Sequence, residues 1–185
     1  MNFSYRGFTL IELLVAVTIF VFLIMLAGPM YGQFMANSQI RNAGEAMLNG
    51  VQQAQATAIK GNTWARLVVD TATGWQILET IEGAEPSPPN PIQVYSKSDG
   101  APNATVTTTP AGATQITFDG FGRILPQNLD GTDAISCFNI TNSNVSGTRN
   151  LRVVVTNTGI GIGTKLCDPA AASTEPQACP ANPCS

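Results

Sequence analysis

The sequence predicts an α+β fold, in which a long N-terminal α-helix packs on antiparallel β-sheet and a loop-rich tail ends the chain. Three observations predict it: an apolar run opens the chain, a helical pattern of apolar positions continues to Lys60, and strand-like runs between turns fill the rest. With 185 residues, 44% of them apolar, the chain can bury one modest core. We therefore expect one globular domain besides the apolar run.

The opening apolar run is long enough to cross a membrane. From Phe8 to Tyr31 the residues are apolar apart from two threonines and Glu12, and about 20 residues span a bilayer as a helix. Arg6 and the α-amino group precede the run without any acid, so the positive-inside rule keeps residues 1–7 in the cytoplasm. The rest of the chain is then expected outside it.

Glu12 is the unusual residue of this run, because a carboxylate in a membrane helix costs about 2.5–3.5 kcal/mol on insertion scales. If the chain is cut after Gly7, the new α-amino group of Phe8 lies four residues away, or about 6 Å along a helix. A neighbouring subunit shifted by one turn would place its amine against Glu12. This contact would set the register of a filament.

Two plainer interpretations of the run are a secretory signal peptide and a signal anchor. A signal peptide fits poorly, because Glu12 lies inside the apolar region, no A-x-A pattern closes it, and helix-like sequence follows Gly28-Pro29. A signal anchor is the stronger alternative. It gives no reason for Glu12.

The sequence GFTLIEL from Gly7 to Leu13, followed by LVAVTIF, resembles the prepilin motif. This resemblance implies that a prepilin peptidase cuts after Gly7, that Phe8 is N-methylated, and that Glu12 supports assembly. The Gly28-Pro29 pair also resembles the place where many pilin helices kink or melt in filaments, and proline removes a helix hydrogen bond. A simple kink at the membrane interface is the alternative.

Beyond Gly32 the pattern is that of an amphipathic helix. Apolar or small residues recur at steps of three and four at Ile40, Ala43, Met47, Val51, Ala54 and Ala58. We expect this helix to continue the membrane helix and to end at Lys60-Gly61, with a basic last turn and a glycine C-cap. A separate surface helix is the alternative.

After Gly61 the period becomes strand-like. The predicted strands are Trp64–Asp70, Gly74–Ile81, Ile92–Tyr95, Ala104–Thr108, Gln115–Phe118, Ile135–Thr141 and Leu151–Asn157. Turns are predicted at Thr71–Gly74 and Asp119–Gly122, and loops at Glu85–Pro91 and Asp168–Ser185. Trp64 and Trp75 flank one turn, and we expect them to stack across the strands in the core; an exposed aromatic patch is the alternative.

This half of the chain resembles the GspH/FimT group of minor pilins and pseudopilins. The matching pieces are GNTWARLVVD from Gly61, ITFDGFGRI from Ile116 and LRVVVTNTGIGIG from Leu151. The resemblance implies a pilin-like fold, with antiparallel sheets after the long helix and a closing strand pair.

The predicted organisation has five parts. Residues 1–7 form a cleaved leader, 8–31 the membrane and filament-core half of the helix, 32–61 its amphipathic half, 62–167 a β-rich extracytoplasmic domain, and 168–185 a tail containing Pro and Cys.

All four cysteines, Cys137, Cys167, Cys179 and Cys184, follow the membrane run and would meet an oxidising space. Four cysteines allow three pairings. We favour Cys137 with Cys167 and Cys179 with Cys184, since each pair is nearest in sequence. A zinc site is the alternative, but histidine and C-x-x-C spacing are absent.

DNA-binding members of the group carry an arginine-rich GRxR stretch near the last strand, where this chain has Gly159-Ile160-Gly161-Ile162-Gly163. Arg123, Arg149, Arg152 and Lys165 could form a basic face, although solvated charges on strands are the ordinary explanation. With a net charge of −3, the chain is not favoured as a DNA-binding protein.

No enzymatic function, cofactor or metal is predicted. The chain has no histidine and lacks a nucleophile elbow, a P-loop and a Rossmann fingerprint. The GIGIG run precedes no helix pattern, so we interpret its glycines as strand and turn residues. The acidic clusters Asp119-Gly120 and Asp130–Asp133 lack EF-hand spacing and are interpreted as turns.

The resulting hypothesis is a minor pilin in the initiating or tip complex of a type IV pilus. A pseudopilin of a type II secretion system, a DNA-receptor pilin and an anchored enzyme are the alternatives. The expected partners are other pilins or pseudopilins, prepilin peptidase and the bacterial inner membrane. The expected location is that membrane, with the C-terminal domain in the periplasm, and then a pilus or pseudopilus at the cell surface.

Overall fold

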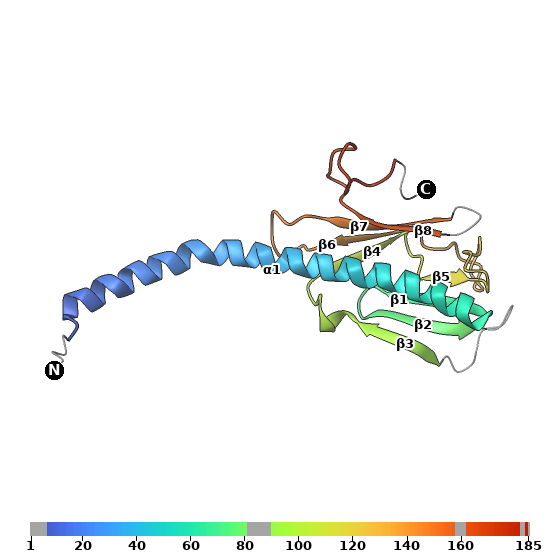
Figure 1. The fold of residues 1–185 in the computed structure, drawn as a ribbon, viewed down its shortest axis with the longest axis horizontal. Coiled ribbons are helices and arrows are strands. Elements are labelled where there is room, and N and C mark those ends of the chain that lie inside the picture. The colour runs from blue at the N-terminus through green and yellow to red at the C-terminus, as the bar shows by residue number, and fades with distance from the viewer. Residues whose placement is uncertain (1–6, 81–89, 158–161, 182–183, 185) are drawn as a thin grey trace, which may run out of the picture.

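The computed structural model describes residues 7–80, 90–157, 162–181 and 184, apart from the side chains of Ala27 and Pro29. A single long helix, α1 (Leu10–Gly61), runs from the N-terminus into a head made of two four-stranded antiparallel sheets (Figure 1). The predicted α+β architecture, with a long helix on antiparallel sheets, is therefore confirmed.

The helix has 52 residues, which corresponds to about 78 Å at 1.5 Å per residue. Its first half projects away from the head, and its second half lies across both sheets (Figure 1). The predicted apolar stripe is confirmed. Its members are at most 3% exposed: Ile40, Ala43, Met47, Val51, Ala54 and Ala58, joined by Ala36.

The helix ends one residue later than predicted. Gly61 is its last helical residue, and the left-handed C-cap is Asn62, with φ 47° and ψ 43°. The Asn62 backbone N–H donates to the carbonyls of Ala58 and Ile59. Asparagine is the residue that, after glycine, most readily takes this conformation, so the predicted glycine cap is replaced by an asparagine cap.

The first sheet has the strand order β3-β2-β1-β5. Its strands are β1 (Trp64–Asp70), β2 (Gly74–Thr80), β3 (Pro91–Ser96) and β5 (Gln115–Phe118), and a short 3-10 helix (Lys97–Asp99) follows β3. The second sheet has the order β4-β6-β7-β8. Its strands are β4 (Thr105–Thr109), β6 (Cys137–Thr141), β7 (Leu151–Asn157) and β8 (Ile162–Cys167).

The strand predictions are correct at β1, β5 and β7 and shifted by one or two residues at β3, β4 and β6. At β2 the predicted last residue, Ile81, lies outside the described residues, as do most of the predicted loop Glu85–Pro91 and Gly159–Gly161. Pro91 itself begins β3. The strand β8 is not among the predicted strands, because its first residues belong to a glycine-rich run and glycine is unfavourable in the interior of a strand.

Glycines let the helix approach the sheets closely. A Cβ at Gly44 would lie 2.8 Å from Leu166 Cδ1 on β8, and a Cβ at Gly50 would lie 2.9 Å from Trp75 Cε2 on β2. Beneath the helix, Phe118 of the first sheet and Phe138 of the second are both fully buried in one continuous core. Both sheets are therefore held together by the same helix face.

The predicted stacking of Trp64 on Trp75 is wrong. In the β1–β2 ladder Trp64 pairs with Thr80 and Trp75 with Val69, so the two rings lie at opposite ends of the hairpin. Trp75 is buried as expected and stacks instead on Tyr95 of β3, with ring centroids 5.6 Å apart. Its indole N–H donates to the Ala46 carbonyl of α1 at 3.0 Å.

We expect Gly50→Ala to destabilise the head, because its Cβ would overlap the buried Trp75 ring at a cost of about 1–3 kcal/mol. Alanine returns about 1 kcal/mol in a helix interior, so the net loss is up to about 2 kcal/mol. Denaturant unfolding of the detergent-solubilised chain measures the change. Gly32→Ala is the matched control, since nothing lies within 4 Å of its Cβ; equal stability of the two variants would contradict the packing argument.

Candidate functional site

The predicted cleavage site lies just outside the helix. Gly7, Phe8 and Thr9 have no regular secondary structure, and Leu10 is the first helical residue. Phe8 is 85% exposed. The Gly7–Phe8 peptide bond therefore lies in accessible, non-helical backbone, which is what a peptidase needs to reach it.

Glu12 closes the first turn of α1 on itself. Thr9 is the N-cap, its hydroxyl accepts from the Glu12 backbone N–H, and the Thr9 backbone N–H donates to Glu12 Oε2, each at 3.3 Å. This is a capping box. The cap role of Thr9 was not predicted, although Thr9-x-x-Glu12 ahead of an apolar run is the sequence signature of a capping box.

The first half of α1 has an apolar surface that the head does not cover. Exposed large apolar side chains follow one another from Phe8 to Met35, and among the described residues α1 is the one helix long and apolar enough to cross a membrane. None of its most apolar window is buried. We call the surface of residues 8–35 the apolar stem.

The helix passes through Gly28 and Pro29 without interruption. A kink or melted turn at this pair inside a filament stays a prediction. From Leu10 onward the stem is one continuous helix that runs into the head.

The predicted disulfide pairing is wrong. The disulfides join Cys137 to Cys184 and Cys167 to Cys179, with Cα atoms 5.4 and 5.0 Å apart. Cys137 on β6 and Cys167 on β8 face different residues of β7, which lies between them. Cys137 and Cys167 are therefore two strand spacings apart, or about 9.6 Å, which is too far for a disulfide. The zinc alternative is also excluded, because all four sulfurs are bonded in pairs.

The two disulfides pin the tail across the face of the second sheet that points away from α1. Val153 and Val155 of β7 belong to the core under the helix, whereas Val154, between them, packs with the four cysteines. The tail runs above β7 and β8 in Figure 1. The predicted loop from Asp168 onward is therefore a covalently attached cover of the sheet.

Asp168 anchors the start of this tail. Arg149 Nη2 donates to Asp168 Oδ2 at 2.6 Å, and the Ala170 backbone N–H donates to Oδ1 at 2.8 Å. The Arg149 hydrogen bond first, and then that of Ala170, lower the pKa of the Asp168 carboxyl, against the opposing effect of burial. Asp168 is thus held in its charged form.

All four basic side chains considered as DNA contacts have a partner within the chain. Arg123 pairs with Asp119 (2.7 Å), Arg149 with Asp168 (2.6 Å), Arg152 Nε donates to Asn139 Oδ1 (2.6 Å), and Lys165 Nζ donates to the Ala178 carbonyl (2.8 Å). Arg123 thus stabilises a turn, Arg152 bridges two paired strands, and Arg149 and Lys165 hold the tail.

The two acidic clusters are turns, as predicted. Asp119 Oδ1 accepts from the backbone N–H groups of Phe121 and Arg123, and Asp130 Oδ1 accepts from Thr132. Although burial would raise the pKa of the Asp119 carboxyl, the hydrogen bonds from Arg123 and Phe121 lower it. Within the described ranges, no three His, Cys, Asp or Glu side chains are grouped so as to hold a metal ion.

Comparison with known proteins gives the family. The model of the type II transport protein GspH family matches residues 43–159, which is more than half of the chain. The chain belongs to the GspH family. The model of the prokaryotic N-terminal methylation motif matches residues 2–28 of this GspH-family chain. The predicted membership of the GspH/FimT group is therefore confirmed.

Two solved structures are similar to this GspH-family chain, both of the type IV minor pilin FimU of Pseudomonas aeruginosa. In one crystal form the identity is 17%, with 71% of this chain and 92% of the other covered and a TM-score of 0.49. In the second form the identity is 16%, the coverage 68% and 91%, and the TM-score 0.45. No curated protein sequence matches the chain.

We expect Asp168→Asn to lower the free energy of unfolding by about 1 kcal/mol at pH 7, because an amide oxygen accepts from Arg149 without the negative charge that strengthens this hydrogen bond. The folded-state pKa is lowered, so this stabilisation is complete above the unfolded value, near 3.9, and disappears as the pH falls through the folded value. Denaturant unfolding at pH 7 and pH 3 should therefore show a difference from wild type that shrinks in acid.

Asp133→Asn is the control, since Asp133 is exposed and forms no ion pair within the described residues. A difference between wild type and Asp168→Asn that stays constant over this pH range would show that the Asp168 carboxylate does not stabilise the tail.

Proposed function

We propose that this chain is a minor pilin, a structural subunit of the initiating or tip complex of a type IV pilus, assembled through its N-terminal helix. The observation that carries the proposal is the division of one continuous helix into a buried half and an uncovered half. The amphipathic half is the spine of the head's core, and the apolar stem has no cover of its own. Only lipid or other apolar helices can shield such a surface from water.

In this proposal the precursor is first inserted in the bacterial inner membrane, with residues 1–7 in the cytoplasm and the head in the periplasm. Prepilin peptidase cuts the accessible Gly7–Phe8 bond, and the new α-amino group of Phe8 is methylated. The match to the N-terminal methylation motif supports both steps. The mature subunit then leaves the membrane for a filament in which neighbouring stems replace the lipid.

Glu12 has two successive roles in this proposal. In the precursor its carboxylate caps the helix through Thr9, which offsets part of the cost of placing it in the membrane. In the filament it accepts the α-amino group of Phe8 from a neighbouring subunit. Both Thr9 hydrogen bonds fall on Oε2 of the carboxylate, which leaves the geometry open to a second donor at Oε1.

A pseudopilin of a type II secretion system is the second candidate, because the family model that matches the head is that of a type II transport protein. Both functions use the same stem and head. The neighbouring genes separate them: genes for other pilus subunits and a retraction motor favour the pilus, and a secretin operon with secreted hydrolases favours secretion.

We expect the membrane-extracted protein to begin at Phe8 and, after reduction of its two disulfides, to be heavier than the sequence from Phe8 onward by one CH2 group. Intact-mass analysis and N-terminal sequencing measure this directly. A mature start beyond Ala27 would identify the stem as a signal peptide and overturn the proposal.

We expect Glu12→Val to insert into the membrane as well as wild type or better, because the buried carboxylate is gone, but to be reduced at least about tenfold in sheared filaments. Glu12→Gln separates the two roles, since glutamine can complete a capping box but carries no charge. If an ion pair between Glu12 and the Phe8 α-amino group of a neighbour is needed for assembly, both variants should be poorly incorporated into filaments.

Thr18→Val is the control, because the Thr18 hydroxyl bonds only to the Val15 carbonyl of its own helix. Normal incorporation of Glu12→Gln would reduce Glu12 to a helix cap and rule out the link to Phe8.

A further inference from the structure

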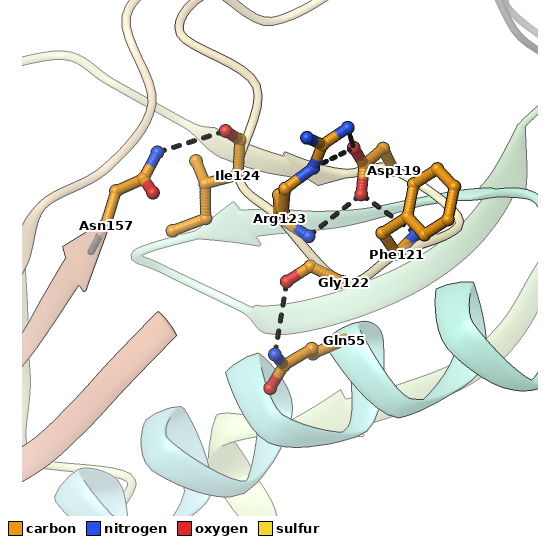
Figure 2. Close-up of polar contacts among 7 residues, drawn as sticks. All are labelled: Gln55, Asp119, Phe121, Gly122, Arg123, Ile124 and Asn157. Atoms are coloured by element: carbon orange, nitrogen blue, oxygen red, sulfur yellow. Dashed lines mark hydrogen bonds and ion pairs between the residues drawn. The ribbon is translucent and has the colours of Figure 1, made fainter. Parts of the chain in front are cut away.

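The turn Asp119–Arg123, which follows β5, carries an exposed aromatic side chain on a backbone fixed by hydrogen bonds. Asp119 Oδ1 accepts from the Phe121 N–H at 3.0 Å and the Arg123 N–H at 2.9 Å, and the Gly122 N–H donates to the Asp119 carbonyl at 2.8 Å. Gln55 of α1 donates to the Gly122 carbonyl at 3.1 Å, and Asn157 of β7 donates to the Ile124 carbonyl at 3.1 Å (Figure 2). The turn is thus fixed to the helix and to the second sheet.

Phe121 itself is not part of the core, because its side chain is 78% exposed. The Arg123 guanidinium lies 5.2 Å from the centre of its ring, and Ile59, 51% exposed, lies beneath the turn at Gly122. The Arg123 side chain is already held by Asp119, and the Phe121 ring projects from a fixed backbone, so binding orders few further bonds. Aromatic residues and arginine are also the residue types enriched in protein interfaces. We call Phe121, Arg123 and Ile59 the distal knob.

The distal knob lies at the end of the head furthest from the membrane. The turn that carries Phe121 and Arg123 contacts the last two turns of α1 through Gly122, which meets Gln55 and Ile59 about 70 Å along the helix from Leu10. Any partner that meets it therefore lies beyond the head. Lipid is excluded as that partner by the distance.

At the opposite end of the head is a groove of about 510 Å³ between α1 and the second sheet. Phe34 of the helix, 68% exposed, and Leu151 and Leu166 of the sheet give it an apolar floor, and Arg149 with Asp168 forms its rim. We call this the neck groove. Phe34 belongs to the apolar stem, so the groove is continuous with the surface proposed to contact other subunits.

Among the described residues, the charged side chains that line the two surfaces are paired within the chain. Arg123 at the knob pairs with Asp119, and at the groove Arg149 pairs with Asp168 and Arg41 with Glu45. Phe34 and Ile59 are 25 positions apart, or about 38 Å along the helix. Two parallel subunits offset by that distance would bring the knob of one to the same axial level as the groove of the other, which permits a heterologous contact that extends a filament.

We propose that the distal knob is the axial contact of this subunit. Its partner is a pilin-like subunit that lies beyond the head in the same filament. The groove between the helix and the head of that partner receives Phe121. This inference rests on the proposed function, because it requires parallel subunits in one filament. It adds a second attachment to that of the stem, which fixes the axial position of the head.

Site-specific photocrosslinking tests the contact in the full chain. With p-benzoylphenylalanine at position 121, irradiation of assembled filaments should link this residue to the neck of a pilin-like subunit, within the stretch of helix that follows the stem or the strands beside it. Mass spectrometry of the linked peptides identifies the subunit and the site. The same probe at Val94, which is 64% exposed on the edge strand β3, is the control and should give no neck adduct.

The variant Phe121→Ala measures how much the knob contributes to incorporation into filaments. Since the side chain is exposed, the unfolding midpoint of the variant should equal that of wild type, whereas its amount in sheared filaments should fall about tenfold. Phe121→Tyr should restore incorporation, and Val94→Ala should leave it unchanged.

The outcomes separate this inference from the proposed function. If the chain is found in filaments but residue 121 forms no link, or links elsewhere than to a pilin neck, the knob contact is wrong and the minor-pilin proposal stands. If the wild-type chain is never found in filaments, both are wrong.

Discussion

The burial of one face of α1 against both sheets is the contact on which the rest of the structure depends. The two sheets share no strand, and their common core is closed by the stripe that includes Met47, Val51 and Ala54. Small residues on this face matter as much as large ones, because Gly44 and Gly50 allow the sheets to approach the helix. The orientation of the head relative to the stem follows directly from this packing.

The same helix therefore serves two environments. From Ala36 onward its buried stripe packs within the chain, and before that point its described large apolar side chains are exposed. No loop interrupts α1, so any force or displacement applied to the stem acts on the core of the head. Such a molecule is mechanically suited to be one unit of a filament, because the helix proposed to contact other subunits is also the spine of its own fold.

The tail on the second sheet and the turn at the distal end of the head are held by different kinds of interaction. On the second sheet, Cys137–Cys184 and Cys167–Cys179 attach the tail covalently, and the ion pair of Arg149 with Asp168 holds its beginning. At the distal end a single carboxylate, Asp119, orders the turn through hydrogen bonds. Basic residues that could have formed a surface for a polyanion are used in this way inside the protein, which agrees with its acidic net charge.

The sequence by itself determined the features that depend on neighbours along the chain: the apolar stem, the motif at Gly7, Phe8 and Glu12, the buried stripe of α1 and seven of the eight strands. Period, length and motif are local properties, and they survive in any tertiary arrangement. Only the tertiary structure decided the cysteine pairs, the stacking of Trp75 on Tyr95 and the exposure of Phe121. These depend on strand order, and in particular on β7 lying between β6 and β8, a non-local pairing that residue spacing does not encode.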